Sequence, residues 1–205
     1  MSALEKLTFL FKNFPGIGPR QARRFVYFLL TRNKDYIEEL VSLIEEVKKG
    51  IKVCDSCRRF FNGNSKSGTC ATCNDANRNS ELLMIVEKDV DFEAVEKSGG
   101  YNGYYFILGG SIPILEKEPE KKIRQKELLK LIEVKLKGQD LKEIIFAFGI
   151  NAEGENTVFY LTNLLQPIVF DKNIKFTTLG RGLSTGLEVE YSDSETLKNA
   201  LKNRG

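Results

Sequence analysis

Four cysteines in two closely spaced pairs constrain this chain more than any other feature. They follow the pattern Cys54-x2-Cys57-x12-Cys70-x2-Cys73. Each pair can place two thiolates on one edge of a tetrahedron, and two pairs complete the four-sulfur shell that zinc prefers. The loop between the pairs is rich in glycine, serine and asparagine and has too few apolar residues to fold alone, so a metal would supply its folding energy. We predict one structural zinc ion per chain, with iron in the same shell as the alternative.

The N-terminal sequence bears on the redox state of these cysteines. Residues 1–18 contain Glu5, Lys6 and Lys12 and lack a small-residue cleavage site, so they do not resemble a signal peptide. The sequence contains no run of about 18 or more apolar residues, so we expect no membrane-spanning helix. We therefore expect a cytoplasmic location, where disulfides are rare. This expectation favours a metal over two disulfide bonds.

The absence of histidine narrows the chemistry that the chain can perform. It excludes Ser-His-Asp and Cys-His nucleophiles and His-ligated metal sites, together with the usual general base at neutral pH. An enzyme built from this sequence would have to rely on carboxylates and metal ions.

A Pro- and Gly-rich segment, 14–19, separates two expected helices over 2–13 and 19–30. Ser2 and Glu5 form a capping-box pattern at the start of the first helix, and Pro19 suits the first position of the second. A third helix is expected over 35–49. The cysteine segment follows this helical region.

The Pro- and Gly-rich segment has the features of a phosphate-binding hairpin. Gly16 and Gly18 let the backbone come close to a phosphate, and the following helix offers free N–H donors and its positive dipole end. Arg20 lies at that helix terminus, and Arg24 follows one turn later on the same face. An ordinary helical hairpin is the alternative, because Pro and Gly mark turns in general.

The distribution of charge favours DNA binding by this hairpin. Residues 1–34 contain seven basic residues and the single acid Glu5, whereas residues 81–205 contain 17 basic and 20 acidic residues. Positive charge at one end of the chain suits contact with a polyanion. The predicted DNA-contacting residues are Gly16, Gly18, Arg20 and Arg24.

From residue 81 onward, short apolar runs alternate with helical patterns, which is typical of a parallel sheet with helices on its faces. The expected strands are 82–86, 104–108, 144–148 and 175–179, and the expected helices are 91–98, 123–137 and 155–165. Residues 187–191 are a candidate for a further strand, and 194–203 for a last helix.

Three acidic residues follow strands of this expected sheet. Glu87 ends the first strand, and Glu153 and Glu155 follow a later one. In an open parallel sheet, residues beyond the carboxyl ends of the strands converge on one crevice. Acids there can hold a divalent ion such as Mg²⁺ for phosphoryl chemistry. The alternative is that they are surface acids at loop tips, and the sequence leaves magnesium binding open.

The order of these pieces resembles the RecR family along nearly the whole chain. Residues 14–30 resemble its helix-hairpin-helix, and the four-cysteine module follows at the family's spacing. Residues 85–115 and 152–157 resemble its Toprim domain, and 179–201 resemble its C-terminal segment. Any one piece is moderately specific, whereas the ordered set is strongly so.

Two short stretches differ from the family pattern. Gly149-Ile150-Asn151 stands where the family usually has Asn-Pro-Thr, and Leu187 replaces an expected second glycine. The resemblance nevertheless implies a multi-part α/β fold. Its expected parts are a helix-hairpin-helix at 1–50, a four-cysteine zinc finger at 51–80, a Toprim-like domain at 81–178 and a C-terminal strand and helix at 179–205.

The resemblance also implies a function. It identifies the four cysteines as zinc ligands, the two hairpin arginines as DNA contacts and the three acids as Toprim acids. It further implies a ring-shaped oligomer, from dimer to tetramer, that works with RecO and RecF to load recombinase on gapped single-stranded DNA. In this interpretation the chain is a non-catalytic DNA clamp and mediator.

Two other functions compete with the mediator. One is a metal-dependent Toprim enzyme that cuts or joins DNA strands, but 205 residues leave no room for a further domain with a nucleophilic tyrosine. The sequence also contains no G-x-x-x-x-G-K-[ST] motif, the usual phosphate-binding signature of ATP-hydrolysing enzymes. The other is a zinc adaptor without a nucleic-acid role, which would leave the basic hairpin unexplained.

An oligomer would need apolar contact surfaces outside the chain's own core. The first and last expected helices each carry an apolar face that either meets another copy or closes the chain's own core. The residues concerned are Leu4, Leu7, Leu10, Phe11, Leu197 and Leu201.

Overall fold

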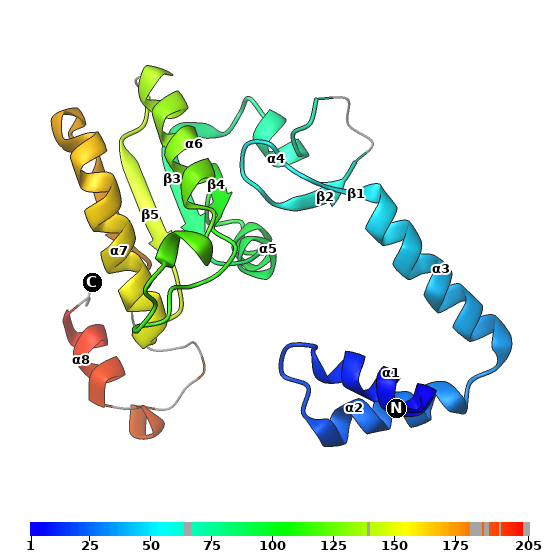
Figure 1. The fold of residues 1–205 in the computed structure, drawn as a ribbon. Coiled ribbons are helices and arrows are strands. Elements are labelled where there is room, and N and C mark those ends of the chain that lie inside the picture. Colours follow the sequence, from blue (N-terminus) through cyan, green and yellow to red (C-terminus); the bar gives the residue numbers. More distant parts are fainter. Residues whose placement is uncertain (64–66, 139, 181–185, 187–188, 193, 203–205) are drawn as a thin grey trace. The chain divides into compact units, whose positions relative to one another are not determined.

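The computed structural model describes residues 1–63, 67–138, 140–180, 186, 189–192 and 194–202 (Figure 1). The chain divides into two compact units, Met1–Ile51 and Lys52–Gly205. The first unit is helical, and the second combines the four-cysteine module with a parallel sheet.

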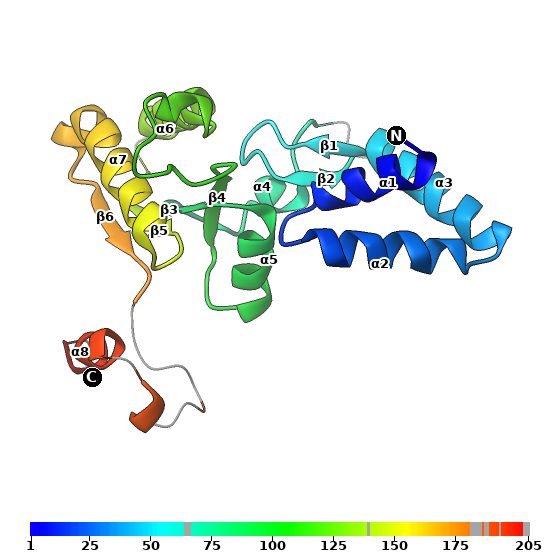
Figure 2. The ribbon, with the colours of Figure 1, turned by 60° about the horizontal axis from the view of Figure 1, so that its bottom comes forward.

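Three helices form the first unit: α1 (Ala3–Lys12), α2 (Pro19–Leu30) and α3 (Lys34–Gly50). The predicted capping box is present, because the Ser2 hydroxyl accepts from the Glu5 N–H and the Glu5 carboxylate accepts from the Ser2 N–H. Pro19 occupies the start of α2, as predicted. Helices α1 and α2 lie side by side (Figure 2).

Packing within this helical unit is sparse. Ala22 and Val26 on α2 are its buried residues, and α1 and α3 have none. Aromatic rings add further contacts, since Phe11 meets both Phe14 and Phe25 edge-on at centroid distances of 5.6 and 5.9 Å. The unit therefore holds its helices together mainly through half-exposed side chains.

The four-cysteine module opens the second unit. Strands β1 (Ile51–Val53) and β2 (Phe60–Asn62) form a two-stranded sheet. The short helix α4 (Ala71–Asn74) begins directly after Cys70. These small elements surround the cysteines and lead into the large sheet.

The large sheet has four parallel strands in the order β4-β3-β5-β6. The strands are β3 (Asn79–Val86), β4 (Gly103–Ile107), β5 (Glu143–Ala147) and β6 (Lys175–Thr178). The connecting helices are α5 (Asp89–Ser98), α6 (Gln125–Gly138) and α7 (Ala152–Val169), with 3₁₀ turns at Pro119–Lys121 and Phe170–Lys172. The four predicted strands and three predicted helices are thus confirmed, with boundaries shifted by a few residues.

Helices cover both faces of this sheet (Figure 2). Alternate residues of β3 point to opposite faces: Leu83 and Ile85 join the core beneath α6 and α7, whereas Met84 and Val86 join the core beneath α5. Burial on both faces explains why this strand is a continuous apolar run rather than an alternating one.

Two boundaries differ from the sequence prediction for identifiable reasons. Helix α7 continues to Val169 past Pro167, because Leu161, Leu165 and Val169 extend one buried stripe along it. Residues Val189–Tyr191, which we expected in a strand, form a 3₁₀ turn instead. Residues 187 and 188, including the unusual Leu187, lie outside the described part. The last helix, α8 (Ser194–Lys202), is present as expected. None of the described helices is long and apolar enough to cross a membrane.

Candidate metal centre and nucleic-acid interface

The four cysteines converge on one point, as their spacing predicts. Their sulfur atoms all lie within 4.8 Å of one another. Cys54, Cys57 and Cys70 are buried, and Cys73 is partly buried. The N–H of Cys70 donates to the sulfur of Cys54 at 3.3 Å, the kind of contact that stabilises a thiolate.

The sulfur spacing fits a metal better than a disulfide. The sulfurs of Cys57 and Cys70 are 3.6 Å apart, whereas a disulfide bond measures about 2.0 Å. Four zinc–sulfur bonds of about 2.3 Å in a tetrahedron place neighbouring sulfurs about 3.8 Å apart. All four cysteines are free thiols. The cluster therefore fits a metal ion such as zinc held by these four side chains.

Thiol contacts within the cluster shift the thiol pKa values apart. A hydrogen bond with Cys57 is the main cause that lowers the pKa of Cys54, and contact with Cys54 is the main cause that raises the pKa of Cys57. Contact with Cys54 raises the pKa of Cys70, but hydrogen bonds with Cys57 and Cys73 outweigh it and bring that pKa to about 6. The four thiols are therefore close enough to shift one another's pKa values, and binding of a metal would require all four to lose their protons.

The cysteine module is joined to the sheet by hydrogen bonds. The N–H of Ile107, at the end of β4, donates to the Cys57 carbonyl at 2.8 Å. The N–H of Phe60 donates to the Asp89 carboxylate at the start of α5, also at 2.8 Å. The metal site is therefore fixed against the strand end and helix that border the acidic residues.

Arg124 strengthens this junction from a distant part of the sequence. Its guanidinium donates to the carbonyls of Arg58 and Ile107 at 2.8 and 3.2 Å. Arg58 itself has the left-handed φ of 66° within the cysteine module. Sequence reasoning missed this arginine, because no local pattern links it to a cysteine loop 66 positions away.

The basic hairpin is a tight turn followed by a helix start. The N–H of Ile17 donates to the Phe14 carbonyl at 3.1 Å. Pro15 and Gly16 occupy the two central positions, and Gly16 has a φ of +74°. A type II turn needs a positive φ at its third residue, which glycine adopts without strain. Gly16 is thus required by the chain's own conformation.

Gly18 has no such internal requirement. It caps α2 with φ −82° and ψ 171°, and a Cβ built there would meet no atom within 4 Å. No side chain caps this helix start, so the first N–H groups of α2 face outward. An open glycine before an uncapped helix N-terminus is the geometry that admits a phosphate.

The two predicted arginines lie at this helix start and are exposed. Arg24 donates to the Gln21 side chain at 3.4 Å. Within the described residues, Arg20 has no ion pair or hydrogen-bond partner, so its charge is not neutralised inside the chain. The hairpin therefore presents positive charge beside free backbone donors.

The three predicted acids lie at the carboxyl end of the sheet. Val86 of β3 pairs with Ala147 of β5, so Glu87 and Phe148 leave the sheet at the same level. The chain order reverses between β3 and β5, the place where open α/β sheets bind ligands. Glu153 and Glu155 lie in the first turn of α7, which follows β5.

The start of α7 also explains the unusual Gly149-Ile150-Asn151 stretch. The Asn151 side chain accepts from the Gly154 N–H at 2.8 Å and caps the helix. A Cβ at Gly154 would lie 2.0 Å from the Gly149 carbonyl oxygen, so this position needs glycine. The departure from the family pattern keeps a capping residue at the helix start.

Lys88 changes the electrostatics of the acidic residues. Its ammonium lies 2.7 Å from the Glu87 carboxylate, which is mostly buried. The hydrogen bond with Glu87 is the main cause that raises the pKa of Lys88, with Asp91 and Glu153 adding to it. Within the described residues, only the four cysteines bring three or more metal-ligand atoms together. A lysine directly after a strand-end glutamate was a visible signal that sequence reasoning passed over.

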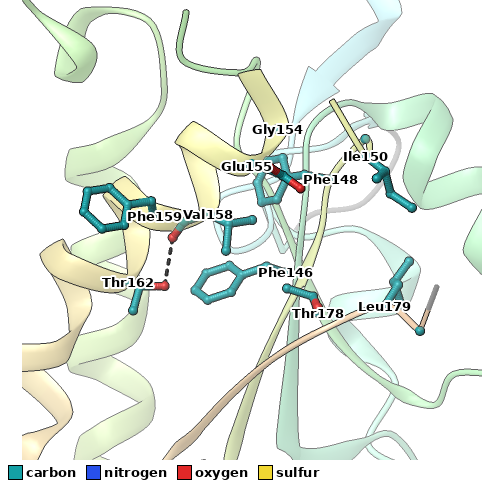
Figure 3. Close-up of a pocket in the computed structure, with 12 residues that line it drawn as sticks. Phe146, Phe148, Ile150, Gly154, Glu155, Val158, Phe159, Thr162, Thr178 and Leu179 are labelled. Atoms are coloured by element: carbon teal, nitrogen blue, oxygen red, sulfur yellow. Dashed lines mark hydrogen bonds between the residues drawn. The ribbon is translucent and has the colours of Figure 1, made fainter. Parts of the chain in front are cut away.

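An apolar cavity of about 490 Å³ lies beside Glu155, between α7 and β6 (Figure 3). Phe146 of β5 and Phe148, just after this strand, line the cavity on one side, and Val158 of α7 lines it on the other. Among the described residues that line it, Glu155 is the one charged side chain, and the wall is otherwise mainly apolar.

These parts define a class of protein. A helical hairpin with a phosphate-type turn, a four-cysteine metal cluster and a parallel sheet with strand-end acids characterise multi-part Toprim proteins that work on nucleic acids. Residues 81–179 match the family described as the Toprim domain, and residues 4–48 match the family described as the RecR helix-hairpin-helix.

Whole-chain relatives identify the family within that class. The chain is 37% identical over 202 residues to "Recombination protein RecR" of Bifidobacterium longum subsp. infantis, which covers 98% of this chain and 95% of the relative. It is 34% identical over 206 residues to the protein of the same name from Bdellovibrio bacteriovorus, covering 100% and 97%. The chain belongs to the RecR family of recombination proteins.

Proposed function

We propose that this protein is a non-catalytic DNA clamp and mediator of recombinational repair in the cytoplasm. It acts with RecO and RecF to load recombinase on gapped or single-stranded DNA. One structural zinc ion per chain is held by Cys54, Cys57, Cys70 and Cys73. Family membership supports the repair role, and the hairpin supports direct contact with DNA.

The geometry of the hairpin carries this proposal. Gly18 is open, the start of α2 has no side-chain cap, and Arg20 has no intramolecular counter-ion among the described residues. Backbone donors and an arginine fork both match phosphate oxygens. Because these groups reach phosphates rather than bases, binding should not depend on base sequence.

A double substitution tests the DNA contact. Arg20→Ala with Arg24→Ala should weaken binding to all DNA sequences and reduce the slope of log affinity against log salt concentration by about 1.5 to 2. The matched control is Lys137→Ala with Lys172→Ala, which removes the same charge from exposed positions of the other unit. If the arginine variant binds DNA as the unmodified protein does, the hairpin is only structural.

The mediator role carries a negative expectation about enzyme activity. Lys88 already places a cation against Glu87, so the charge of this carboxylate is partly neutralised by the chain itself. Purified protein in magnesium should not nick, relax, prime or ligate DNA. Activity that survives purification and disappears in Glu87→Gln or Glu153→Gln would instead support the metal-dependent Toprim enzyme.

A closed oligomer would explain how a small basic surface binds DNA usefully, since several copies act together. Apolar side chains of α1 and α8 remain exposed in the single chain: Leu4 at 40%, Leu10 at 59% and Leu201 at 65%. Light scattering should give a dimer or tetramer mass.

A ring also predicts a difference between DNA forms. Circular DNA should resist a high-salt wash better than linear DNA with free ends, and equal loss of both would rule out a ring.

A further inference from the structure

The exposed face of α2 carries an aromatic ring among its arginines. At about 100° per residue, Tyr27 points within about 20° of Arg20, about 40° of Arg23 and about 60° of Arg24. By the same geometry, the buried residues Ala22 and Val26 point about 140° and about 100° away from Tyr27. Tyr27 is therefore central to the basic face that begins at the hairpin.

The Tyr27 ring and the Arg23 charge on this face are free to contact a ligand. Tyr27 is 55% exposed. Its hydroxyl has no hydrogen-bond partner among the described residues, and the same is true of the Arg23 guanidinium. Tyr27 also takes no part in the apolar groove of about 510 Å³ on this unit, which Phe25 and Phe28 line from α2. The ring is thus separate from the unit's apolar packing surface.

We propose that Tyr27 is a stacking platform for a base of single-stranded nucleic acid, with Arg20, Arg23 and Arg24 holding the flanking phosphates. The inference rests on the proposed DNA-binding function and deepens it by assigning a strand preference. A flat ring within a basic surface is the combination that binds single strands without sequence preference. A duplex keeps its bases stacked on one another, so it gains little from the ring.

Charge distinguishes this occupant from a second copy of the chain. In a two-fold symmetric contact the same patch meets itself, so three arginines would face three arginines. Such like charges repel, whereas a polyanion is attracted. The charge of this face therefore favours nucleic acid over self-association.

Binding measurements with three variants test the proposal. Stacking on an aromatic side chain contributes roughly fivefold to more than a hundredfold in affinity per base. Tyr27→Ala should therefore weaken binding to an oligo-dT strand by about fivefold or more and change duplex affinity by less than about twofold. Tyr27→Phe should bind as the unmodified protein does. Tyr191→Ala, which removes a ring that is 72% exposed elsewhere, is the matched control.

A fluorescence experiment tests the stacking directly. The chain contains no tryptophan, so Tyr27→Trp introduces a single reporter, with Tyr191→Trp as its control. Oligo-dT should quench the emission of Tyr27→Trp more strongly than duplex does, and it should leave Tyr191→Trp unchanged.

Four outcomes would overturn the inference. Two concern binding by Tyr27→Ala: an equal loss of affinity for single strands and duplex, or unchanged affinity for both. The third is equal quenching of Tyr27→Trp by single strands and duplex. The fourth is an oligomeric mass of Tyr27→Ala below that of the unmodified protein. The last would make Tyr27 an interface between copies. The Arg20 and Arg24 double variant separates the two proposals: if it loses DNA binding while Tyr27→Ala keeps it, only the stacking inference fails. If the double variant binds normally, the proposed function fails as well.

Discussion

The two units of this protein reach stability in different ways. Residues 1–51 bury only Ala22 and Val26 and leave most of their large apolar side chains half-exposed. The sheet of the second unit buries two apolar clusters, one on each face, and the cysteine module beside it is organised around four converging thiols. The second unit therefore has its own core, whereas the first has little.

This difference suits the proposed division of work. A helical unit with a small core can present charge, an aromatic ring and apolar surface to DNA and to other copies. The α/β unit holds Glu87 directly after β3 and Glu153 and Glu155 in the first turn of α7. It is fastened to the cysteine module through Cys57 and Arg124.

Loss of the metal should have the largest effect and should remain within the second unit. A structural zinc ion contributes on the order of 10 kcal/mol to the folding of a small module. Cys57→Ser should lower the zinc content well below one per chain and expose the amides of residues 52–78 to hydrogen exchange. Helices α1–α3 should keep their protection. Ser56→Ala is the control, and full zinc occupancy in Cys57→Ser would contradict the assignment of the ligands.

The next largest effect should come from shortening an apolar side chain, which should lower the stability of the two units by different amounts. Leu161→Ala removes a fully buried side chain of α7 and should lower the free energy of unfolding of the α/β unit by about 2–5 kcal/mol. Leu10→Ala removes an exposed side chain of α1 and should cost less than about 0.5 kcal/mol in its own unit. Denaturant titration measures both. Leu10→Ala should instead reduce the oligomeric mass, and a stability loss as large as that of Leu161→Ala would break the contrast between the units.

Removal of the Lys88 charge should raise the affinity of the strand-end acidic site for Mg²⁺. Lys88→Met leaves Glu87 without its ion pair, so Mg²⁺ affinity should rise about tenfold, which corresponds to about 1.4 kcal/mol. Titration calorimetry with Mg²⁺ provides the measurement. Lys122→Met breaks an ion pair with Glu116 instead and should leave Mg²⁺ affinity unchanged. Equal affinities in the two variants would show that Lys88 does not neutralise this site.

The two hairpin glycines should give the smallest effects and separate conformation from contact. Gly16→Ala places a side chain at a φ of +74° and should destabilise the helical unit by about 1–2 kcal/mol. Gly18→Ala should cost less than about 1 kcal/mol but weaken DNA binding several-fold, because its Cβ enters the phosphate path. Thermal unfolding and DNA titration of both variants distinguish these roles, and normal DNA binding by Gly18→Ala would argue against a close backbone approach there.

Local signals in the sequence determined the secondary structure and the candidate metal site. The capping box at Ser2, the proline at the start of α2 and the two cysteine pairs each act within a few residues. Local hydrogen bonds and ligand spacing therefore make them readable without the fold. The apolar run of β3 was equally readable, because burial on both faces leaves no polar positions. Even the helical spacing of Tyr27 and the arginines is written in the sequence, although only exposure shows that the ring is available.

Only the tertiary structure decided how these pieces meet. It placed the Lys88 ammonium against Glu87 and brought Arg124 to the carbonyl of Arg58. It also made Gly154 necessary through the nearby Gly149 carbonyl, and it formed a turn over 189–191 where the sequence suggested a strand. The physical reason is the same in each case. Each feature depends on which groups occupy the neighbouring space once the chain has folded, and alternation or helical periodicity along one segment carries no information about the other side of a contact.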